Sequence, residues 1–312
     1  MARAQGINAE MRVATEATYG TAPSAAAFRK QPFVSHSLGV ERGLVEDDQL
    51  GGGRNGFDPT PDVVTNDGDV VVPVDTDAFG WWLRAMFGPP VTSGTTDKTH
   101  LFTAGATTLP SMSIEFGHPD VPSYSNNFGA VANQLRIQMT RGGLLNATIG
   151  IIAQGEEPKS NTSKAPSAAM VRGPRFAQAT GQVSKDGVQL GNVVSTDITI
   201  SNGLDKVEVI RPDGMIDGVD PGRLMVSGST TVRFADHVLL DAATNNTPMA
   251  LNLGWTNGTR SLVFAMPRVF LPRVKRPITG PGGIQATFNW QASGANAAMI
   301  TASLVNQVAS YA

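Results

Sequence analysis

Short runs of alternating apolar and polar residues recur along the chain and are separated by turn-forming pairs. Residues 135–139, 197–201 and 286–290 alternate in this way, and residues 70–74 and 112–116 are further strand-like runs. An alternation with a period of two is typical of β-strands with one buried face. The pairs between the runs supply the positive φ angles that tight hairpins require; they are Asp67-Gly68, Asp186-Gly187, Asn202-Gly203, Asp213-Gly214, Asp217-Gly218 and Asn257-Gly258. The pattern predicts a mainly β protein.

One segment departs from the β pattern and predicts a helix around residues 79–87. Its apolar positions follow the spacing i, i+3, i+4 and i+7: Phe79, Trp82, Leu83 and Met86. Asp75 or Thr76 can cap its first turn, and Gly88-Pro89-Pro90 ends it. The apolar stripe is expected to lie against a sheet.

Two stretches of the chain have the same order of predicted elements. A shift of 160 residues places residues 38–44 on 198–204 and residues 68–74 on 228–234. After deletions in the second stretch, residues 112–117 meet 249–254. The shared order is strand, long loop, strand, helix, strand, Gly-Gly and strand, with a shorter helix around residues 236–243. An internal duplication explains this order, and a chance alignment of two Gly-rich β sequences is the alternative.

The repeat and a polar, Pro/Ser-rich stretch predict how the chain is divided. The expected parts are an N-terminal arm at 1–32, a first β domain at 33–155, a linker at 156–173 and a second β domain at 174–312. Each domain is expected to carry one flanking α-helix.

Composition excludes several functional classes. The 312 residues include 24 Lys and Arg against 26 Asp and Glu, a net charge of −2 without the basic footprint of a sequence-specific nucleic-acid binder. The absence of cysteine excludes disulfides, zinc–thiolate sites and thiol catalysis. With 34 Gly and 20 Pro, the chain favours many turns over long helices. No secretory signal is visible at the N-terminus, and no apolar run approaches the ~20 residues that cross a bilayer.

No convergent set of catalytic or ligating residues is visible. The four histidines are isolated in different segments, and no Gly-x-Ser-x-Gly motif occurs. Residues 51–54 (Gly-Gly-Gly-Arg) lack the Lys-Ser/Thr of a phosphate-binding loop. We therefore expect no enzyme activity, no metal and no cofactor.

Two charged segments stand out as candidate interfaces. Acidic residues gather in and around the loop at 44–66, with Phe57 as its only aromatic residue, and basic residues gather at 267–277. A glycosidase would need two carboxylates facing a sugar cleft lined by aromatic residues, so a solvated or interface role is favoured for the acids. The basic run is favoured as a charged strand face that pairs with an acidic neighbour.

Three motifs together resemble the tail tube (major tail) proteins of long-tailed bacteriophages. They are residues 16–22 (Glu-Ala-Thr-Tyr-Gly-Thr-Ala), residues 51–54, and residues 67–75 leading into Phe-Gly-Trp-Trp-Leu at 79–83. The resemblance implies β-sandwich or barrel domains with a flanking helix, assembled into rings that stack to form a tube for DNA. It also implies an N-terminal arm that locks neighbouring subunits and a long loop that reaches the next ring. The residues expected at these contacts are Tyr19, Glu46, Asp47, Asp48, Gly52, Arg54, Phe57, Asp58, Arg273 and Lys275.

A chain with two copies of the domain is expected to form the ring with three subunits instead of six. The expected partners are further copies of the chain, a tape measure protein and a tail terminator, with DNA passing transiently and no membrane involved. The expected location is the virion, in a tail without a contractile sheath, after synthesis in the host cytoplasm. The alternatives are a carbohydrate-binding or adhesin-like β-sandwich, a terminator or baseplate protein of the same fold, and an enzyme of unrecognised type.

Overall fold

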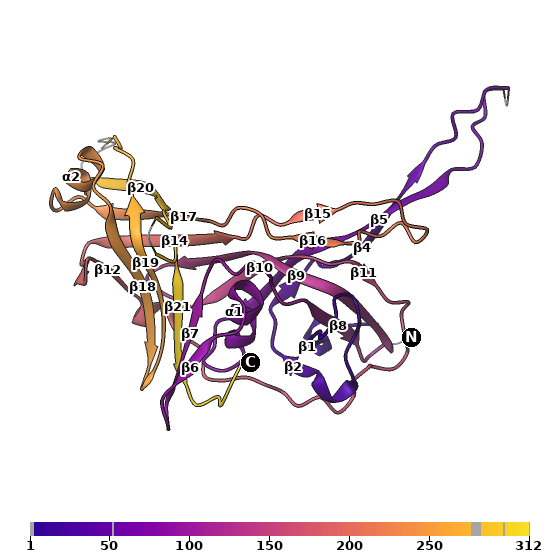
Figure 1. Cartoon of the computed structure of the whole chain (residues 1–312), viewed down its shortest axis with the longest axis horizontal. Helices are drawn as coiled ribbons and strands as arrows, with labels where there is room; N and C mark the ends of the chain where they lie inside the picture. The colour runs from indigo at the N-terminus through magenta and orange to yellow at the C-terminus, as the bar shows by residue number, and fades with distance from the viewer. Residues whose placement is uncertain (1–2, 52, 276–281, 296, 312) are drawn as a thin grey trace.

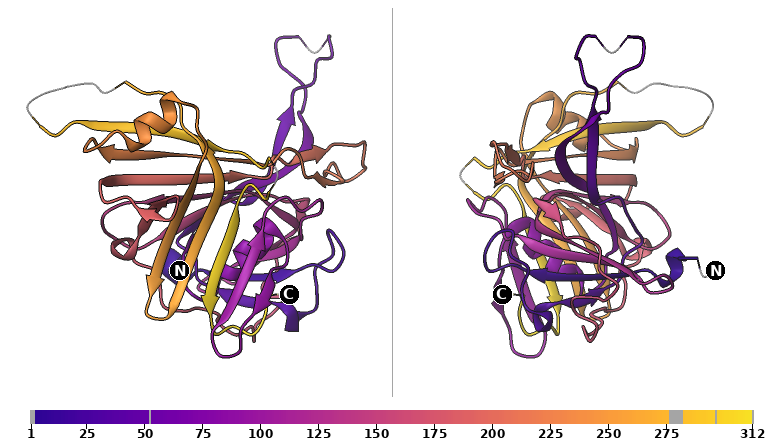
Figure 2. Two further views of the ribbon diagram at one scale, coloured as in Figure 1. Left: turned by 60° about the vertical axis from the view of Figure 1, so that its left-hand side comes forward. Right: turned by 90° about the vertical axis from the view of Figure 1, so that its right-hand side faces the viewer.

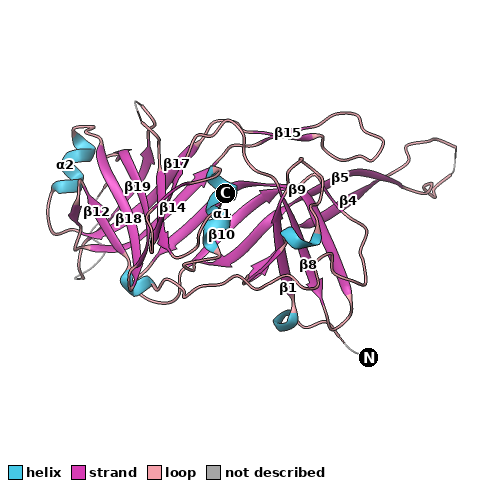
Figure 3. Ribbon diagram, turned by 60° about the horizontal axis from the view of Figure 1, so that its bottom comes forward, coloured by secondary structure: helices cyan, strands magenta, loops and turns pink. Residues whose placement is uncertain are grey.

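The chain folds into antiparallel β-sheets with two short α-helices among the described residues (Figures 1 and 3). The computed structural model describes residues 3–51, 53–275, 282–295 and 297–311. Strands account for 48% of the described residues. The prediction of a mainly β protein is confirmed.

The first half of the chain, up to residue 156, contains the first eleven strands and the longer helix. Its elements are η1 Gly6–Asn8, β1 Glu10–Thr15, η2 Ala25–Ala27, β2 Arg29–Gln31, β3 Ser35–His36, β4 Gly39–Val45, β5 Thr60–Pro73, α1 Phe79–Phe87, β6 Val91–Ser93, β7 Lys98–Thr103, β8 Met112–His118, β9 Ser123–Met139, β10 Asn146–Ile152 and β11 Gly155–Glu156.

The second half contains the remaining strands and the shorter helix. Its elements are η3 Gln178–Thr180, β12 Gln182–Lys185, β13 Val188–Gln189, β14 Val193–Ser201, β15 Asp205–Val207, β16 Gly218–Asp220, β17 Met225–Arg233, α2 Val238–Thr244, β18 Met249–Asn257, β19 Arg260–Phe270, β20 Gln285–Ala292 and β21 Thr301–Asn306.

One sheet runs through both halves in the order β4–β5–β10–β9–β14–β17–β20–β19. Its halves meet where β9 pairs with β14. β9 is long enough to join two layers, because its first part pairs with β8 and its last part pairs with β10 and β14. Further strands, β1 with β8 and β12 with β18, extend the second layer in each half.

The two halves share one continuous core. The same cluster of buried residues contains Phe79 and Leu135 from the first half and Ile198 and Phe264 from the second. Burial of this apolar surface is the main stabilising contribution to the fold, at about 25 cal/mol per Å². The halves are therefore coupled energetically through side-chain packing as well as through the β9–β14 ladder.

The predicted helix forms where the sequence places it. Asp75 caps the turn before α1, because its Oδ1 accepts hydrogen bonds from the backbone N–H groups of Asp77 at 2.7 Å and Ala78 at 2.6 Å. Gly88 ends the helix with φ of 91°, a value that favours glycine. Near the C-terminus, Tyr311 is fully buried against α1 and donates a hydrogen bond from its hydroxyl to the Asp77 carbonyl at 2.6 Å.

The segments predicted as an N-terminal arm and as a linker both contact the rest of the chain. Within one chain, residues 10–31 are built into the sheet, because β1 pairs with both β2 and β8. The stretch at 156–173 lies along the first half: Lys164 donates its backbone N–H to Glu115 at 2.6 Å, and Ala165 is buried. Long-range pairing and burial hold both segments, and neither factor is visible in their local composition. The proposed domain division itself stays a prediction.

Candidate assembly surfaces

The most prominent surface feature is a hairpin formed by β4 and β5, which we call the β4–β5 arm (residues 39–73). Figures 1 and 2 show it extending well beyond the body of the molecule. Large apolar side chains on the arm are exposed although they are of the type that cores bury; they are Leu44, Val45, Leu50, Phe57 and Val63. Apolar groups grouped on a projecting element mark an interaction surface.

The arm carries most of the predicted contact residues. Glu46, Asp48, Arg54, Phe57 and Asp58 are all exposed near its tip. Asp47 is half-buried and accepts hydrogen bonds from the backbone and side-chain N–H groups of Gln49, both at 2.9 Å. Gly52 lies outside the described residues. The structure thus brings these residues to one tip, as their sequence proximity predicts.

The arm is strongly acidic. Residues 39–73 contain eight Asp and Glu residues against two Arg, whereas the whole chain is almost neutral. Such a surface repels other acidic surfaces and attracts cationic ones. It therefore needs a cationic or neutral counterpart in any assembly.

Tyr19, predicted as a contact residue, is half-buried against its own chain. Its ring lies so close to Gly129 and Gly218 that a Cβ added to either glycine would contact the ring. Burial raises the pKa of its phenol to about 12, with smaller contributions from Glu16 and Asp217. Glu16 is itself buried and accepts hydrogen bonds from Ser113 Oγ at 2.7 Å and Gly129 N–H at 2.9 Å. The Glu-Ala-Thr-Tyr-Gly motif thus contributes to local packing within the chain.

Arg273 and Lys275 lie just beyond the end of β19 and are exposed, with half-buried Val274 between them. In the strand order of the main sheet, this segment and β4 stand at the two opposite ends. The predicted acidic and basic contact residues therefore occupy different edges of one chain.

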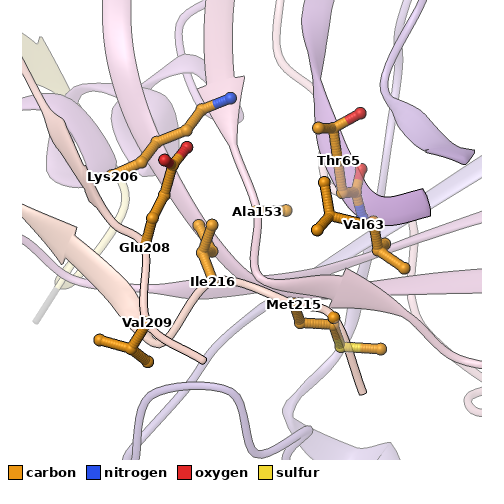
Figure 4. Close-up of a pocket in the computed structure, with 11 residues that line it drawn as sticks. Val63, Thr65, Ala153, Lys206, Glu208, Val209, Met215 and Ile216 are labelled. Atoms are coloured by element: carbon orange, nitrogen blue, oxygen red, sulfur yellow. The ribbon is translucent and has the colours of Figure 1, made fainter. Parts of the chain in front are cut away.

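A second long loop, residues 202–224, which includes β15 and β16, contacts the base of the β4–β5 arm. Lys206 Nζ lies 2.7 Å from Asp67 Oδ2, and Val64 N–H donates to the Gly214 carbonyl at 2.9 Å. Between loop and arm lies a largely apolar cavity of about 150 Å³ (Figure 4). Its lining includes Val63, Ala153, Val209, Met215 and Ile216.

One arginine of this loop is paired with two of its acidic residues. Arg211 bonds Asp213 and Asp217, and its hydrogen bonds to Asp213 lower the pKa of that carboxyl to about 2. The sequence analysis did not assign a role to this loop. The Asp213-Gly214 and Asp217-Gly218 pairs give its turns, but no local signal indicates its contact with the arm.

The described residues offer little for catalysis or membrane insertion. In the part of the chain that the structure describes, no group of three His, Asp or Glu residues is arranged to hold a metal ion. The same residues include no helix long and apolar enough to span a membrane. The surfaces that stand out are the arm, the loop beside it and the sheet edges.

A sequence model described as phage tail tube protein matches residues 6–292. The chain belongs to this family. The match covers both halves of the chain and includes the arm, α1 and the segment that follows β19. No match is found among curated proteins.

Membership decides several of the predictions. The resemblance to tail tube proteins is confirmed, and so is the prediction that the chain is not an enzyme, because phage tail tube proteins are a structural family. The protein is a phage tail structural protein and a virion component.

Proposed function

We propose that this tail tube protein assembles into stacked rings of three chains, which form the conduit for phage DNA at ejection. Each half of the chain would occupy one of six equivalent positions around the ring. Family membership supports assembly into a tube, and the correspondence between the two halves supports three chains per ring.

The observation that carries the proposal is that both halves pair their strands in the same register. Adding 160 to each residue of β5 and 139 to each residue of β10 turns the β5–β10 ladder into the β17–β20 ladder, so that Val72↔Ala147 becomes Val232↔Ala286. The same two additions convert β3 and β4 with β5 into β14 with β17, and β9 with β10 into β19 with β20. A register slip of one residue would invert every side chain, so agreement across several ladders is a demanding test of equivalence.

Irregularities in the ladders also coincide. The β8–β9 ladder shifts its register between Met112 and Ile114, and the β18–β19 ladder shifts between Met249 and Leu251. Residues 112–117 and 249–254 are the segments that the sequence comparison aligns. Bulges of this kind are specific features of a fold.

A glycine with a close backbone neighbour occurs at one further matching position in the two halves. An added Cβ on Gly68 would lie 2.6 Å from the Ser37 carbonyl, and one on Gly228 would lie 2.1 Å from the Asp197 carbonyl. One residue later in each half, the backbone N–H donates to the partner's side chain: Asp69 to Ser37 Oγ at 2.9 Å, and Ser229 to Asp197 Oδ2 at 3.2 Å. Both glycines are needed because another backbone approaches so closely.

Charge is compatible with a DNA conduit. Because DNA is a polyanion, a lumen with many cationic groups would retain it, whereas a chain with net charge −2 has no cationic excess. Tape measure and terminator proteins are proposed as partners on the same grounds of family, and a tail without a contractile sheath is favoured.

Electron microscopy of the purified chain, with rotational averaging of end-on views, tests this function. Hollow rings with a mass three times 32.7 kDa are expected, and six times that mass would overturn the trimer. Rings that never stack would favour a terminator or baseplate role. Monomers that form no ring, even when seeded with tail tips, would overturn the tube and favour a binding module.

A further inference from the structure

The main sheet passes from one half of the chain to the other at a joint whose residues are all described. At this joint β9 pairs with β14, with Leu135 opposite Ile200 and Gln134 opposite Ser201. Asn202 N–H donates to the Asn133 carbonyl at 2.8 Å. Leu135 and Ile200 are both completely buried.

In the order of the main sheet, this internal joint connects β9, the last strand of the first half, to β14, the first strand of the second half. In the second half, the counterpart of the last part of β9 is the segment that continues β19, reached by adding 139. In the first half, the counterpart of β14 is the β3–β4 edge, reached by subtracting 160. β4 stands at one end of the main-sheet order, and the segment that continues β19 follows the other end, whereas the earlier part of β19 pairs with β18 and β21.

We propose that the segment at 271–275 of one chain pairs with β4 of the next chain, in the register of the internal joint. Gly39 then lies opposite Lys275, Val40 opposite Val274, and Glu41 opposite Arg273. The occupant of each edge is a second copy of this chain. This inference rests on the proposed ring and specifies the residues that close it.

Both edges are available within the described part of the chain. The ladder that β4 forms there is with β5, and residues 271–275 form none. Val40 N–H points away from β5 and donates to Glu156 Oε2 at 3.1 Å, a side chain that a neighbouring carbonyl can replace. Unpaired edges of this kind are templates for another strand.

The residues at the two free edges are more exposed than their counterparts in the internal joint, as expected if another chain covers them. Val40 is 38% exposed, whereas its counterpart Ile200 is 0% exposed. Val274 is half-buried, whereas its counterpart Leu135 is fully buried. Pairing Val40 with Val274 would cover apolar surface that the single chain leaves in water.

Charge at the proposed joint is complementary. Where the internal joint has Ser201 opposite Gln134, the joint between chains has exposed Glu41 opposite exposed Arg273. Because Asn202 and Asn133 form a hydrogen-bonded pair, the adjacent pair is of the non-hydrogen-bonded type, in which side chains lie closest. Glu41 and Arg273 would thus meet across the strands.

Pro272 fits this register although it lacks an N–H group. Its counterpart Asn133 contributes its carbonyl to the internal joint, and proline keeps that carbonyl. Asn133 also lies where the β9–β10 ladder changes register, between Gln134, the partner of Gly150, and Ala132, the partner of Ile151. Such an irregular position tolerates proline. Arg42 N–H would be the matching donor.

Disulfide trapping tests the register directly, because the natural chain has no cysteine. Single variants E41C and R273C are purified, mixed under assembly conditions, oxidised and separated on a non-reducing gel. The expected result is about tenfold more covalent dimer than from the off-register mixture of E41C with V274C, since Cys side chains on opposite faces cannot be bridged. Each single variant oxidised alone is the second control.

The double variant E41C/R273C gives a second readout. Because every chain then carries both cysteines, oxidised rings should give covalent products of up to three chains and no larger product. Electron microscopy of the unmodified chain is done in parallel. Rings without the E41C–R273C product, or with equal product from the off-register mixture, would overturn the register while leaving the ring in place. Absence of rings in the unmodified chain would overturn the proposed function and the joint together.

A charge exchange separates pairing from folding. E41R and R273E are each expected to reduce ring formation at low salt, and E41R/R273E is expected to restore it, because the ion pair is reversed and not lost. Circular dichroism of the unassembled variants checks that they fold. Failure of the double variant to exceed both single variants would count against the contact.

Discussion

The two α-helices each follow a strand of the main sheet, α1 after β5 and α2 after β17, but they differ in their packing. In α1, Phe79, Trp82 and Leu83 are buried, and both β9 and β7 contact the helix. In α2, Leu239 and Ala243 are the buried residues, and Val238 is 46% exposed. The same element is thus central to the core in one half and peripheral in the other.

The elements that follow the two helices differ as well. The β6–β7 hairpin follows α1, whereas α2 is separated from β18 by only a short turn. β7 pairs with β21 of the second half, with Phe102 opposite Ala302, so this hairpin joins the halves beside α1. The long loops differ too, because the first half projects an acidic arm and the second half folds its loop against that arm.

The largest effect is expected from replacing one buried side chain in each helix with alanine. Trp82→Ala should lower the free energy of unfolding by about 3–5 kcal/mol, because it leaves a large cavity in the shared core. Leu239→Ala should lower it by about 2 kcal/mol, since α2 packs at the periphery. Urea denaturation of the unassembled chain measures both. Equal losses would contradict the difference between the helices.

Corresponding glycines should respond alike. Gly68→Ala and Gly228→Ala should each lower the free energy of unfolding by about 1–3 kcal/mol, because the added methyl meets a backbone carbonyl. Gly191→Ala is the matched control, since an added Cβ there meets nothing within 4 Å. Thermal unfolding followed by circular dichroism provides the measurement. A neutral result at one glycine and a loss at the other would weaken the equivalence of the halves.

The residues that cap the two helices should differ in how much they contribute to stability. Asp75→Ala should cost about 1 kcal/mol, and Asp236→Ala a few tenths, because Asp236 is exposed and accepts from Val238 N–H at 3.0 Å. Burial raises the pKa of Asp75, although hydrogen bonds from the backbone of Asp77 and Ala78 oppose the increase.

A raised pKa in the folded state means that Asp75 contributes less to stability as pH rises above its unfolded value of 3.8. The asparagine of the Asp75→Asn variant does not titrate. The free energy of unfolding of this variant minus that of the natural chain should therefore be higher at pH 7 than at pH 4. Urea denaturation at both pH values checks the sign. If the stability of Asp75→Asn relative to the natural chain instead falls between pH 4 and pH 7, the backbone hydrogen bonds to Asp75 outweigh its burial.

The smallest effect is expected where the second-half loop meets the arm. Lys206→Ala should change stability by less than about 1 kcal/mol, because the Lys206–Asp67 pair is largely exposed. Added salt should reduce the difference further. Denaturation at low and high salt tests this, with Lys185→Ala as the control for an exposed ion pair outside the contact.

Much of the local structure could be predicted from the residues themselves. The period of two gave the strands, and the stripe from Phe79 to Met86 with its cap gave α1, because both depend on neighbours a few positions away. Family motifs near the arm indicated the tail tube family, and the acidic residues of the tip lie close together because one hairpin contains them.

Other features depended on contacts between residues far apart in the chain. The placement of β1 against β8, the burial of Tyr19 and the contact of the 202–224 loop with the arm all lie in this class. Their local sequences permit several arrangements of similar energy. Packing of the whole core selects one of them.

The sequence by itself therefore determined the element types, their order, the family and the residues at the tip of the arm. Only the tertiary structure decided which edges of the sheet are paired and in which register, as at the β9–β14 joint. The physical reason is that periodicity is a property of neighbouring residues, whereas register is set by apolar faces that must be buried together across the whole sheet.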